Sequence, residues 1–386
     1  MKRNLMKPMF LFLLLLFTLP AVRAAADPPK PMDADNGNPA DLDRRIAALE
    51  ARIQNRPALA ECLDRISFSG VLEAEAGYAS VDDDDPAAED ENSSDATLAT
   101  LEIGIDAAIC DHVTGHVLFL WEEDDTEPVD MDEGFITLSG GESLPLYVRA
   151  GKMYVPFGVF ESHMISDPLT LELGETRESA VQVGFETNGW HGSIFGFNGD
   201  IDEAGEDSHL DNFGGSAGFI FANAAFGMDL NVSYINNLLD SDGWGENAAE
   251  RMEAEGLALA DYIDGIGASA VLTCGPLTFI GEYVAALDDP DFVSAKDDAS
   301  LVSGEKISAF NAELACCLDV AGKETTAAVA YQGTNHAGDF LPETRIAGVI
   351  GAGIFDATTL ALEYARETYE NDDTEDRVTL QLAVEF

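Results

Sequence analysis

The sequence predicts an all-β fold, a transmembrane antiparallel β-barrel of sixteen strands preceded by a short N-terminal helix. Three observations lead to this prediction. Segments in which apolar and polar residues alternate recur from residue 66 onwards, the connections between them are long and short in turn, and the last such segment ends on Phe386. Alternation with a period of two gives a strand one apolar and one polar face. A closed barrel can turn the apolar faces to lipid and the polar faces to a lumen.

The first residues predict export from the cytoplasm. Lys2, Arg3 and Lys7 make a basic start, an apolar run covers residues 9–19, and Ala24, Ala25 and Ala26 follow. Basic, apolar and small residues in this order form a secretory signal peptide, which we place at residues 1–26. The apolar run is too short to span a membrane as a helix.

Residues 27–40 contain four prolines among Asp, Asn and Gly, and we expect a flexible linker there. Residues 41–56 differ, because Leu42, Ile46, Leu49 and Ile53 recur with heptad spacing. This pattern predicts a short helix. It favours a small trimerisation element or periplasmic tether, or alternatively a helix that lies on the barrel rim.

The barrel is expected over residues 57–386, and its strands come from the alternating segments. A strand tilted in a bilayer needs about 9–11 residues to cross it. The predicted strands cover 66–78, 96–110, 116–123, 131–139, 146–154, 180–187, 191–198, 212–222, 228–236, 264–273, 277–286, 307–316, 324–332, 343–353, 358–369 and 376–386.

The connections separate a membrane barrel from a soluble sandwich. Those after odd-numbered strands are long and acidic, whereas those after even-numbered strands are short, as at Asn188-Gly189, a tight-hairpin signal. Long loops at one end and tight turns at the other are typical of outer-membrane barrels. The terminal strand resembles the signal read by the bacterial barrel assembly machinery, so we expect that partner and a Gram-negative outer membrane.

Charge excludes other classes of function. The chain has 20 basic and 72 acidic residues, a net charge of 20 − 72 = −52. Nucleic acid is an unfavourable partner, because its phosphates require Lys and Arg.

No catalytic triad or cofactor motif is present, so we expect no enzyme and no cofactor. Cys110, His112 and His116 would need a fourth ligand to hold zinc, and we expect no metal site.

The connection after the fifth strand predicts the functional site. It is long, mixes aromatic and charged residues, and in a barrel of this size could fold into the lumen and narrow it. An external loop packed over the barrel mouth is the alternative. By strand parity Arg149 faces the lumen. The predicted constriction residues are Arg149, Phe157, Phe160, His163, Asp167, Glu172, Glu175 and Arg177.

The mature chain resembles the LbtU-type siderophore porins. The resemblance rests on the heptad helix, residues 151–158 (GKMYVPFG), residues 166–176 (SDPLTLELGET) and residues 195–199 (FGFNG). It implies a sixteen-stranded outer-membrane barrel that admits a ferric siderophore without TonB. The Pro-Phe-Gly portion also resembles phosphate-selective porins.

The predicted function is therefore passive diffusion through an outer-membrane porin. Ferric siderophore is the solute that the resemblance implies, and phosphate or another small solute is the alternative. A structural or adhesive barrel is the alternative of another class. Outer-membrane lipid is an expected partner, and a homotrimer would suit this class of protein. An anionic siderophore fits poorly with so acidic a chain, because like charges repel.

All five cysteines fall near the predicted short-turn end, in a compartment that permits oxidation. Two bridges are predicted from topology, Cys62 to Cys110 and Cys274 to either Cys316 or Cys317. The alternative is that all five are small residues tolerated at strand ends.

Overall fold

The computed structural model describes residues 65–83, 91–123, 126, 128–141, 144–206, 208–294, 301–338 and 340–386. The predicted signal peptide, linker and heptad helix, together with Cys62, lie outside the described residues. Their assignments stay predictions.

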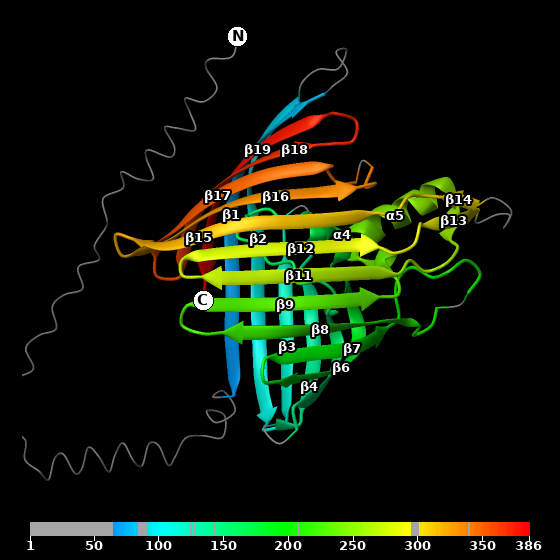
Figure 1. Cartoon of the computed structure of the whole chain (residues 1–386), viewed down its shortest axis with the longest axis horizontal. Coiled ribbons are helices and arrows are strands. Elements are labelled where there is room, and N and C mark those ends of the chain that lie inside the picture. The colour runs from blue at the N-terminus through cyan, green and yellow to red at the C-terminus, as the bar shows by residue number, and fades with distance from the viewer. Residues whose placement is uncertain are drawn as a thin grey trace, which may run out of the picture. The chain divides into compact units, whose positions relative to one another are not determined.

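Sixteen antiparallel strands close into one barrel, as the alternation predicted (Figure 1). Going round the barrel from β1, the order is β1, β19, β18, β17, β16, β15, β12, β11, β9, β8, β7, β6, β5, β4, β3 and β2. Their bounds are β1 Ile66–Asp82, β2 Glu91–Cys110, β3 Val113–Trp121, β4 Asp130–Ser139, β5 Leu146–Tyr154, β6 Arg177–Thr187, β7 Trp190–Phe197, β8 Asn212–Ala222, β9 Phe226–Ile235, β11 Gly265–Cys274, β12 Leu277–Ala286, β15 Ser308–Val320, β16 Lys323–Asn335, β17 Thr344–Phe355, β18 Thr358–Thr368 and β19 Thr374–Glu385.

Connections alternate in length around the barrel. Tight turns join β6 to β7, β11 to β12 and β17 to β18, whereas long segments join β5 to β6, β9 to β11 and β12 to β15. We call the two rims the short-turn end and the long-loop end. The long segments contain α4 (Leu169–Gly174), η2 (Leu238–Asp240), α5 (Asp242–Glu255), β10 (Leu257–Leu259), β13 (Asp291–Ser294) and β14 (Leu301–Ser303). The sequence patterns did not predict these elements.

The outer face of the barrel is apolar and exposed. Ile194, Val329 and Ile346 are 68%, 60% and 59% exposed, whereas Ala330 and Ala347, one residue along from the last two, are buried. An exposed apolar exterior on a closed sheet is what lipid requires, since every backbone group in the wall pairs with a neighbour. Among the described residues no helix is both long and apolar enough to cross a membrane.

The first and last strands close the barrel. Gly70 and Phe386 exchange backbone hydrogen bonds of 2.9 and 3.0 Å. Glycine suits position 70, because a Cβ there would lie 2.9 Å from the Glu102 carbonyl oxygen and 2.5 Å from Cζ of the Phe386 ring. Gln381 donates from Nε2 to Glu75 at 2.9 Å, so its side chain lies on the inner face of the seam. Leu382, the next residue, is 41% exposed on the outer face.

An apolar core lies inside the barrel towards the long-loop end. Phe157, Leu169 and Leu173 from the segment between β5 and β6 pack in one buried cluster with Leu238 and Trp244 from the segment between β9 and β11. α4 and α5 contact each other, as Figure 1 shows at one end of the barrel. This core fixes one end of the segment that enters the lumen.

Candidate functional site: a loop inside the barrel

The segment 155–176, which we call the lumen loop, lies inside the barrel. Its first contact with the opposite wall is at β9, where the Gly158 amide donates to Ser233 Oγ at 3.1 Å. Gly158 has φ +75°, a conformation that favours glycine. On β11 the inward Gly267 leaves room for the Ser233 hydroxyl that binds the loop, since a Cβ there would lie 2.5 Å from Ser233 Oγ.

Three glutamates of the wall hold the loop backbone, and we call Glu282, Glu313 and Glu363 the clamp carboxylates. Glu282 on β12 accepts from the amides of Val159 at 2.8 Å and Phe160 at 3.0 Å. It also accepts from Thr170 Oγ1 at 3.0 Å. Because its two oxygens take separate amides, this carboxylate fixes the direction of the chain as well as its position.

Glu313 on β15 holds the next part of the loop. It accepts from Ser162 Oγ at 2.8 Å and from the His163 amide at 3.0 Å. The His163 ring lies against the same carboxylate, with Nδ1 2.7 Å from Oε1. Glu313 is 1% exposed, so its charge is stabilised by these donors and not by bulk water.

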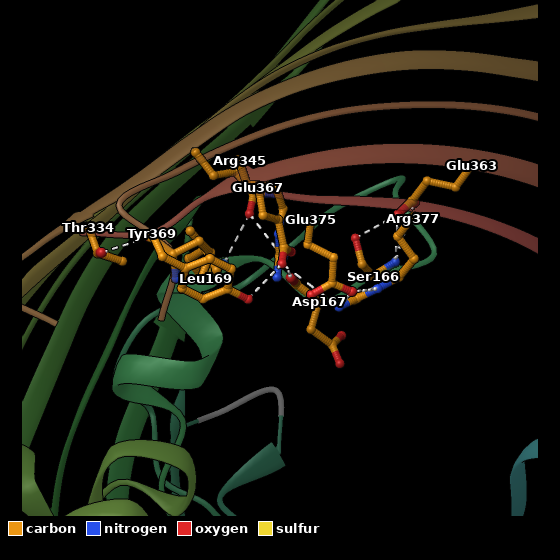
Figure 2. A network of polar contacts seen from close by, with 12 residues as sticks. Ser166, Asp167, Leu169, Thr334, Arg345, Glu363, Glu367, Tyr369, Glu375 and Arg377 are labelled. Carbon is orange, nitrogen blue, oxygen red and sulfur yellow. Dashed lines mark hydrogen bonds and ion pairs between the residues drawn. The ribbon is translucent and has the colours of Figure 1, made fainter. Parts of the chain in front are cut away.

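Glu363 on β18 completes the clamp at the far side of the loop. It accepts from Ser166 Oγ at 2.6 Å and from the amides of Ile165 and Ser166 (Figure 2). The clamp carboxylates are 6%, 1% and 3% exposed in sequence order. Hydrogen bonds to an ionised acceptor are stronger than neutral ones, so the three together hold the loop firmly.

Arg345 on β17 extends this network to the end of the loop. Its Nη1 donates to the Asp167 carbonyl oxygen at 2.6 Å, and its Nε donates to Glu367 at 2.6 Å (Figure 2). Gln332 Oε1 on β16 accepts from the Leu169 amide at 3.2 Å. Arg377 on β19 lies 3.8 Å from Glu367, so that carboxylate is shared between two arginines.

Small side chains make room for the loop beneath these polar contacts. Met164 packs on a buried group formed by Ala330, Ala347 and Ala365 on three adjacent strands. With Ile165 it also packs on a second group, whose members are Ala315, Ala328, Val349 and Ala361. A larger residue at these inward positions would push the loop off the wall. The strands β9, β11, β12, β15, β16, β17 and β18 therefore form a loop-bearing wall.

The open wall, which we define as β19, β1 and β2, has no such contacts with the loop among the described residues. Its inward carboxylates include Glu73, Glu75 and Glu102, which make no ion pair among the described residues, and Glu375 and Asp106, which pair with Arg377 and His116. Glu75 accepts from Gln381, and Glu73 accepts from the Thr100 hydroxyl. The Asp167 side chain of the loop is exposed and lies close enough for its charge to interact with Glu73 and Glu75. The loop tip and the open wall therefore face each other with like charges.

A cavity of about 1040 Å³ lies between the loop tip and the short-turn end. The loop contributes His163, Met164 and Ile165 to its lining, and the open wall contributes Gln381 and Ala383.

The end of the loop that leads into β6 is anchored at the long-loop end. Arg177 pairs with Asp132 on β4, and the Asp242 amide of α5 donates to the Glu175 carbonyl oxygen at 2.8 Å. Burial, strengthened by repulsion from Asp242, raises the pKa of the Glu175 carboxyl to about 8. Burial likewise raises the pKa of Asp242 to about 6.

The eight predicted constriction residues lie in different parts of the structure and do not form one ring. His163 and Asp167 lie on the part of the loop that faces the lumen. Arg149 faces inward as predicted, with its guanidinium 4.5 Å from the Phe135 ring centroid, on the β5 side of the barrel. Glu172 belongs to α4, and Glu175 and Arg177 belong to the anchor.

The two aromatic predictions need correction. Phe157 is 1% exposed in the apolar core, and Phe160 packs against that core, so neither is placed to line an open passage. The sequence reasoning also missed Glu282, Glu313, Glu363 and Arg345. A signal was available for Glu282 and Glu363, because each is a charged residue at an inward strand position between apolar or small inward neighbours, Ile280 and Val284 for the first and Ala361 and Ala365 for the second.

The predicted bridge from Cys274 is wrong. Cys110, Cys274, Cys316 and Cys317 are free. Leu277 of β12 pairs with both Cys274 on β11 and Cys316 on β15, so β12 lies between them. Two strand spacings put the cysteines about 10 Å apart, beyond the range of about 7 Å for a disulfide. Cys110 is free as well, so the predicted bridge from Cys62 to Cys110 is also absent, while Cys62 itself lies outside the described residues.

The His116 ring contacts two carboxylates and not a cysteine. Nδ1 lies 2.8 Å from Asp106 and Nε2 lies 3.4 Å from Glu133. In the part of the chain that the structure describes, no three His, Cys, Asp or Glu residues are placed to hold a metal ion.

Comparison with known proteins supports the fold and leaves the family open. No family model matches the chain. A protein of Coxiella burnetii named UPF0422 protein is 27% identical over 314 residues, 79% of this chain and 64% of its own length. A UPF0422 protein of Legionella pneumophila is 24% identical and is matched over 59% of its length. The chain thus spans about three fifths of the relatives it matches.

Among solved structures, the chain is similar to outer-membrane channels. The channel DcaP of Acinetobacter baumannii is 14% identical with a TM-score of 0.55, covering 83% of this chain and 97% of that one. An anion-selective porin of Comamonas acidovorans is 12% identical with a TM-score of 0.53, covering 83% and 99%. OmpF of Salmonella typhi is 11% identical with a TM-score of 0.55, covering 83% and 97%. At these low sequence identities, the structural similarity shows a shared porin-like fold and no more.

The barrel is that of a Gram-negative outer-membrane protein. An even number of antiparallel strands, an apolar exterior, tight turns at one rim and long loops at the other are its defining features. The predicted sixteen-stranded barrel and its location are confirmed, and the N-terminal helix stays a prediction.

Proposed function

We propose that the protein is a passive outer-membrane porin, with a water-filled passage between the lumen loop and the open wall. The observation that carries this proposal is the one-sided attachment of the loop. The clamp carboxylates hold it against β12, β15 and β18, and the open wall of β19, β1 and β2 keeps polar side chains facing inward with no such contacts to the loop among the described residues. A plug would be expected to contact the wall all round.

The constriction in this proposal lies at the loop tip. His163 is held by Glu313 on one side, and Asp167 faces the open wall. Of the eight residues predicted from the sequence, these two are the ones we assign to the narrowest part. Sixteen strands enclose a lumen wide enough for small solutes once a loop has narrowed it.

For the solute, the resemblance to LbtU-type porins supports a ferric siderophore that passes without TonB. Phosphate or another small solute is the second candidate, supported by the Pro-Phe-Gly segment. A structural or adhesive barrel is the candidate of another class, and the acidic long loops are the feature that favours it.

Planar-bilayer recording and liposome uptake test the function together. We expect stable single-channel steps from the purified protein, and uptake of at least one of ferric siderophore, phosphate and a neutral sugar. A folded barrel that never conducts would contradict the porin and favour the structural candidate. Conductance with uptake of phosphate but not of ferric siderophore would favour the second solute.

For assembly, we propose recognition of the terminal strand by the barrel assembly machinery. The Phe386 ring, 71% exposed, lies at the seam where β19 meets β1. A homotrimer is the proposed assembly. Crosslinking in native membranes tests it, and a single band at the monomer mass would contradict it.

A further inference from the structure

We infer that the passage selects cations and disfavours anions, because of fixed, uncompensated carboxylates on the open wall. The inference rests on the proposed porin function and names the class of solute that the passage admits: inorganic cations, and organic or metal complexes with a positive or zero net charge. It concerns selectivity during permeation and does not require a bound ion.

The first step is the charge on the open wall. Glu73 and Glu75 point inward from β1, and Glu102 points inward from β2 on the same side. The hydrogen-bond partners of Glu73 and Glu75 are Thr100 and Gln381, which are neutral. Among the described residues none of the three carboxylates makes an ion pair.

The second step is that the inward arginines near the loop are already neutralised. Arg345 is paired with Glu367 at 2.6 Å and binds the Asp167 carbonyl oxygen. Arg377 on β19 is paired with Glu375 at 2.9 Å and also lies near Glu367. Figure 2 shows Arg345 and Arg377 among these carboxylates. Their positive charge therefore does not offset Glu73, Glu75 and Glu102.

Arg149 is the inward arginine without an ion pair in the described part of the barrel. It lies on β5, stacked on Phe135 and near Tyr147, two strands or more from Glu102 on β2. A cation there leaves the open wall acidic. Arg149 also places a positive charge on the β5 side of the barrel, away from the open wall.

The third step is the carboxylate on the loop itself. The Asp167 side chain is exposed on the loop next to Ser166 and close enough to Glu73 and Glu75 for their charges to interact, although Arg345, which binds the Asp167 carbonyl oxygen, offsets part of its charge. Low-dielectric walls focus the field of such charges into the passage. Because the clamp carboxylates and Arg345 fix the loop backbone around Asp167, its carboxylate stays on the lumen side of the loop, where a passing cation reduces the repulsion between carboxylates.

The consequence divides the solute candidates. Phosphate and a ferric siderophore with net negative charge would enter against this field, whereas a ferric complex with zero or positive net charge would not. The solved structure of an anion-selective porin shares the fold, but the fold alone does not fix the sign of selectivity.

The reversal potential in a KCl gradient tests the inference. We expect the full-length wild-type protein to conduct and to favour K⁺ over Cl⁻. The triple variant Glu73→Gln, Glu75→Gln, Glu102→Gln should still conduct, with the preference for K⁺ reduced by about fivefold. Glu246→Gln, an exposed carboxylate on α5, is the matched control and should leave the ratio unchanged.

The outcomes separate this inference from the porin proposal. A wild-type protein that gives no conductance overturns the porin itself. A protein that conducts but favours Cl⁻ overturns the cation selectivity and leaves the porin standing. A triple variant with the wild-type ratio, in a barrel that folds normally on a heat-modifiability gel, overturns the assignment to the open wall.

Discussion

The loop-bearing wall and the open wall belong to one sheet and both present glutamates to the lumen, yet these glutamates do different work. On the loop-bearing wall the clamp carboxylates are almost fully buried and accept amides from residues 159–166. On the open wall Glu73, Glu75 and Glu102 are half-buried, and Glu73 and Glu75 accept from the neutral side chains of Thr100 and Gln381. Glutamates position the loop on the loop-bearing wall, and on the open wall they set the electrostatic potential of the passage.

The difference comes from what the neighbouring residues supply. A buried carboxylate is costly unless donors replace its water. The loop supplies those donors from its own backbone, and the inward alanines of β15–β18 let it come close enough to do so. On the open wall the described loop residues supply no amides, and its carboxylates are only half-buried.

Removing two clamp carboxylates should produce the largest effect. Glu313→Ala with Glu363→Ala leaves the amides of His163 and Ile165 without acceptors, at about 1–3 kcal/mol for each group. We expect the loop tip to detach and single-channel currents to become noisy, with a changed mean conductance. Bilayer recording measures both.

The matched control removes two carboxylates from the open wall. Glu73→Ala with Glu75→Ala should change selectivity but leave the current as quiet as that of the wild type, because neither residue holds the loop in the described structure. Equal noise in the two double variants would show that the clamp carboxylates do not position the loop.

Placing an arginine on the lipid-facing side of β19 should have the next largest effect, measured as a loss of stability. Leu382 faces lipid and Gln381 faces the lumen. Leu382→Arg should therefore cost about 2–4 kcal/mol if it lies near the bilayer midplane, whereas Gln381→Arg should be tolerated. Urea unfolding in lipid vesicles gives both values. If the two variants were equally stable, the register at the seam would be wrong.

Enlarging a side chain beneath the loop should lower the stability of the barrel by a smaller amount. Ala347→Leu enlarges a residue that packs against Met164, and overpacking of this kind costs about 1–3 kcal/mol. Ala383→Leu places the same enlargement on the open wall, where it borders the cavity of about 1040 Å³. We expect Ala347→Leu to destabilise the barrel and alter conductance, with little change in stability for Ala383→Leu. The opposite ranking would place the loop on the other wall.

Strand periodicity was enough to predict the barrel. The alternation of apolar and polar residues is a local signal, and a strand such as 376–386 has the same faces in the structure as in the pattern. The alternation of long and short connections was likewise visible, since turns such as Asn188-Gly189 have a local chemistry.

The candidate site could be predicted only in part, because its contacts join distant residues. Nothing near Val159 or His163 indicates that Glu282 and Glu313 will accept their amides, and these pairs are more than a hundred residues apart. The aromatic residues misled the prediction for a physical reason. Phe157 is apolar enough to join the core with α4 and α5, which removes it from the passage. The disulfide prediction failed because it misplaced Cys274 by one strand.

The smallest expected effect concerns the anchor of the loop and depends on pH. Burial raises the pKa of Glu175 to about 8, above its ordinary value of 4.5. The folded state therefore binds more protons than the unfolded state between these values, so stability falls as the pH rises from about 4.5 to about 8. Glu175→Gln has no carboxyl to ionise at this position, so it removes this pH-dependent loss of stability. We expect no difference from the wild type at pH 4, and a gain of about 1 kcal/mol at pH 9 once partial access to water is discounted. Urea unfolding at the two pH values measures the gain, with Glu246→Gln on α5 as the exposed control. A variant that is less stable than the wild type at pH 9 would mean that the ionised Glu175 carboxylate stabilises the anchor, so that attachment at this end of the loop would depend on charge, as it does at the clamp.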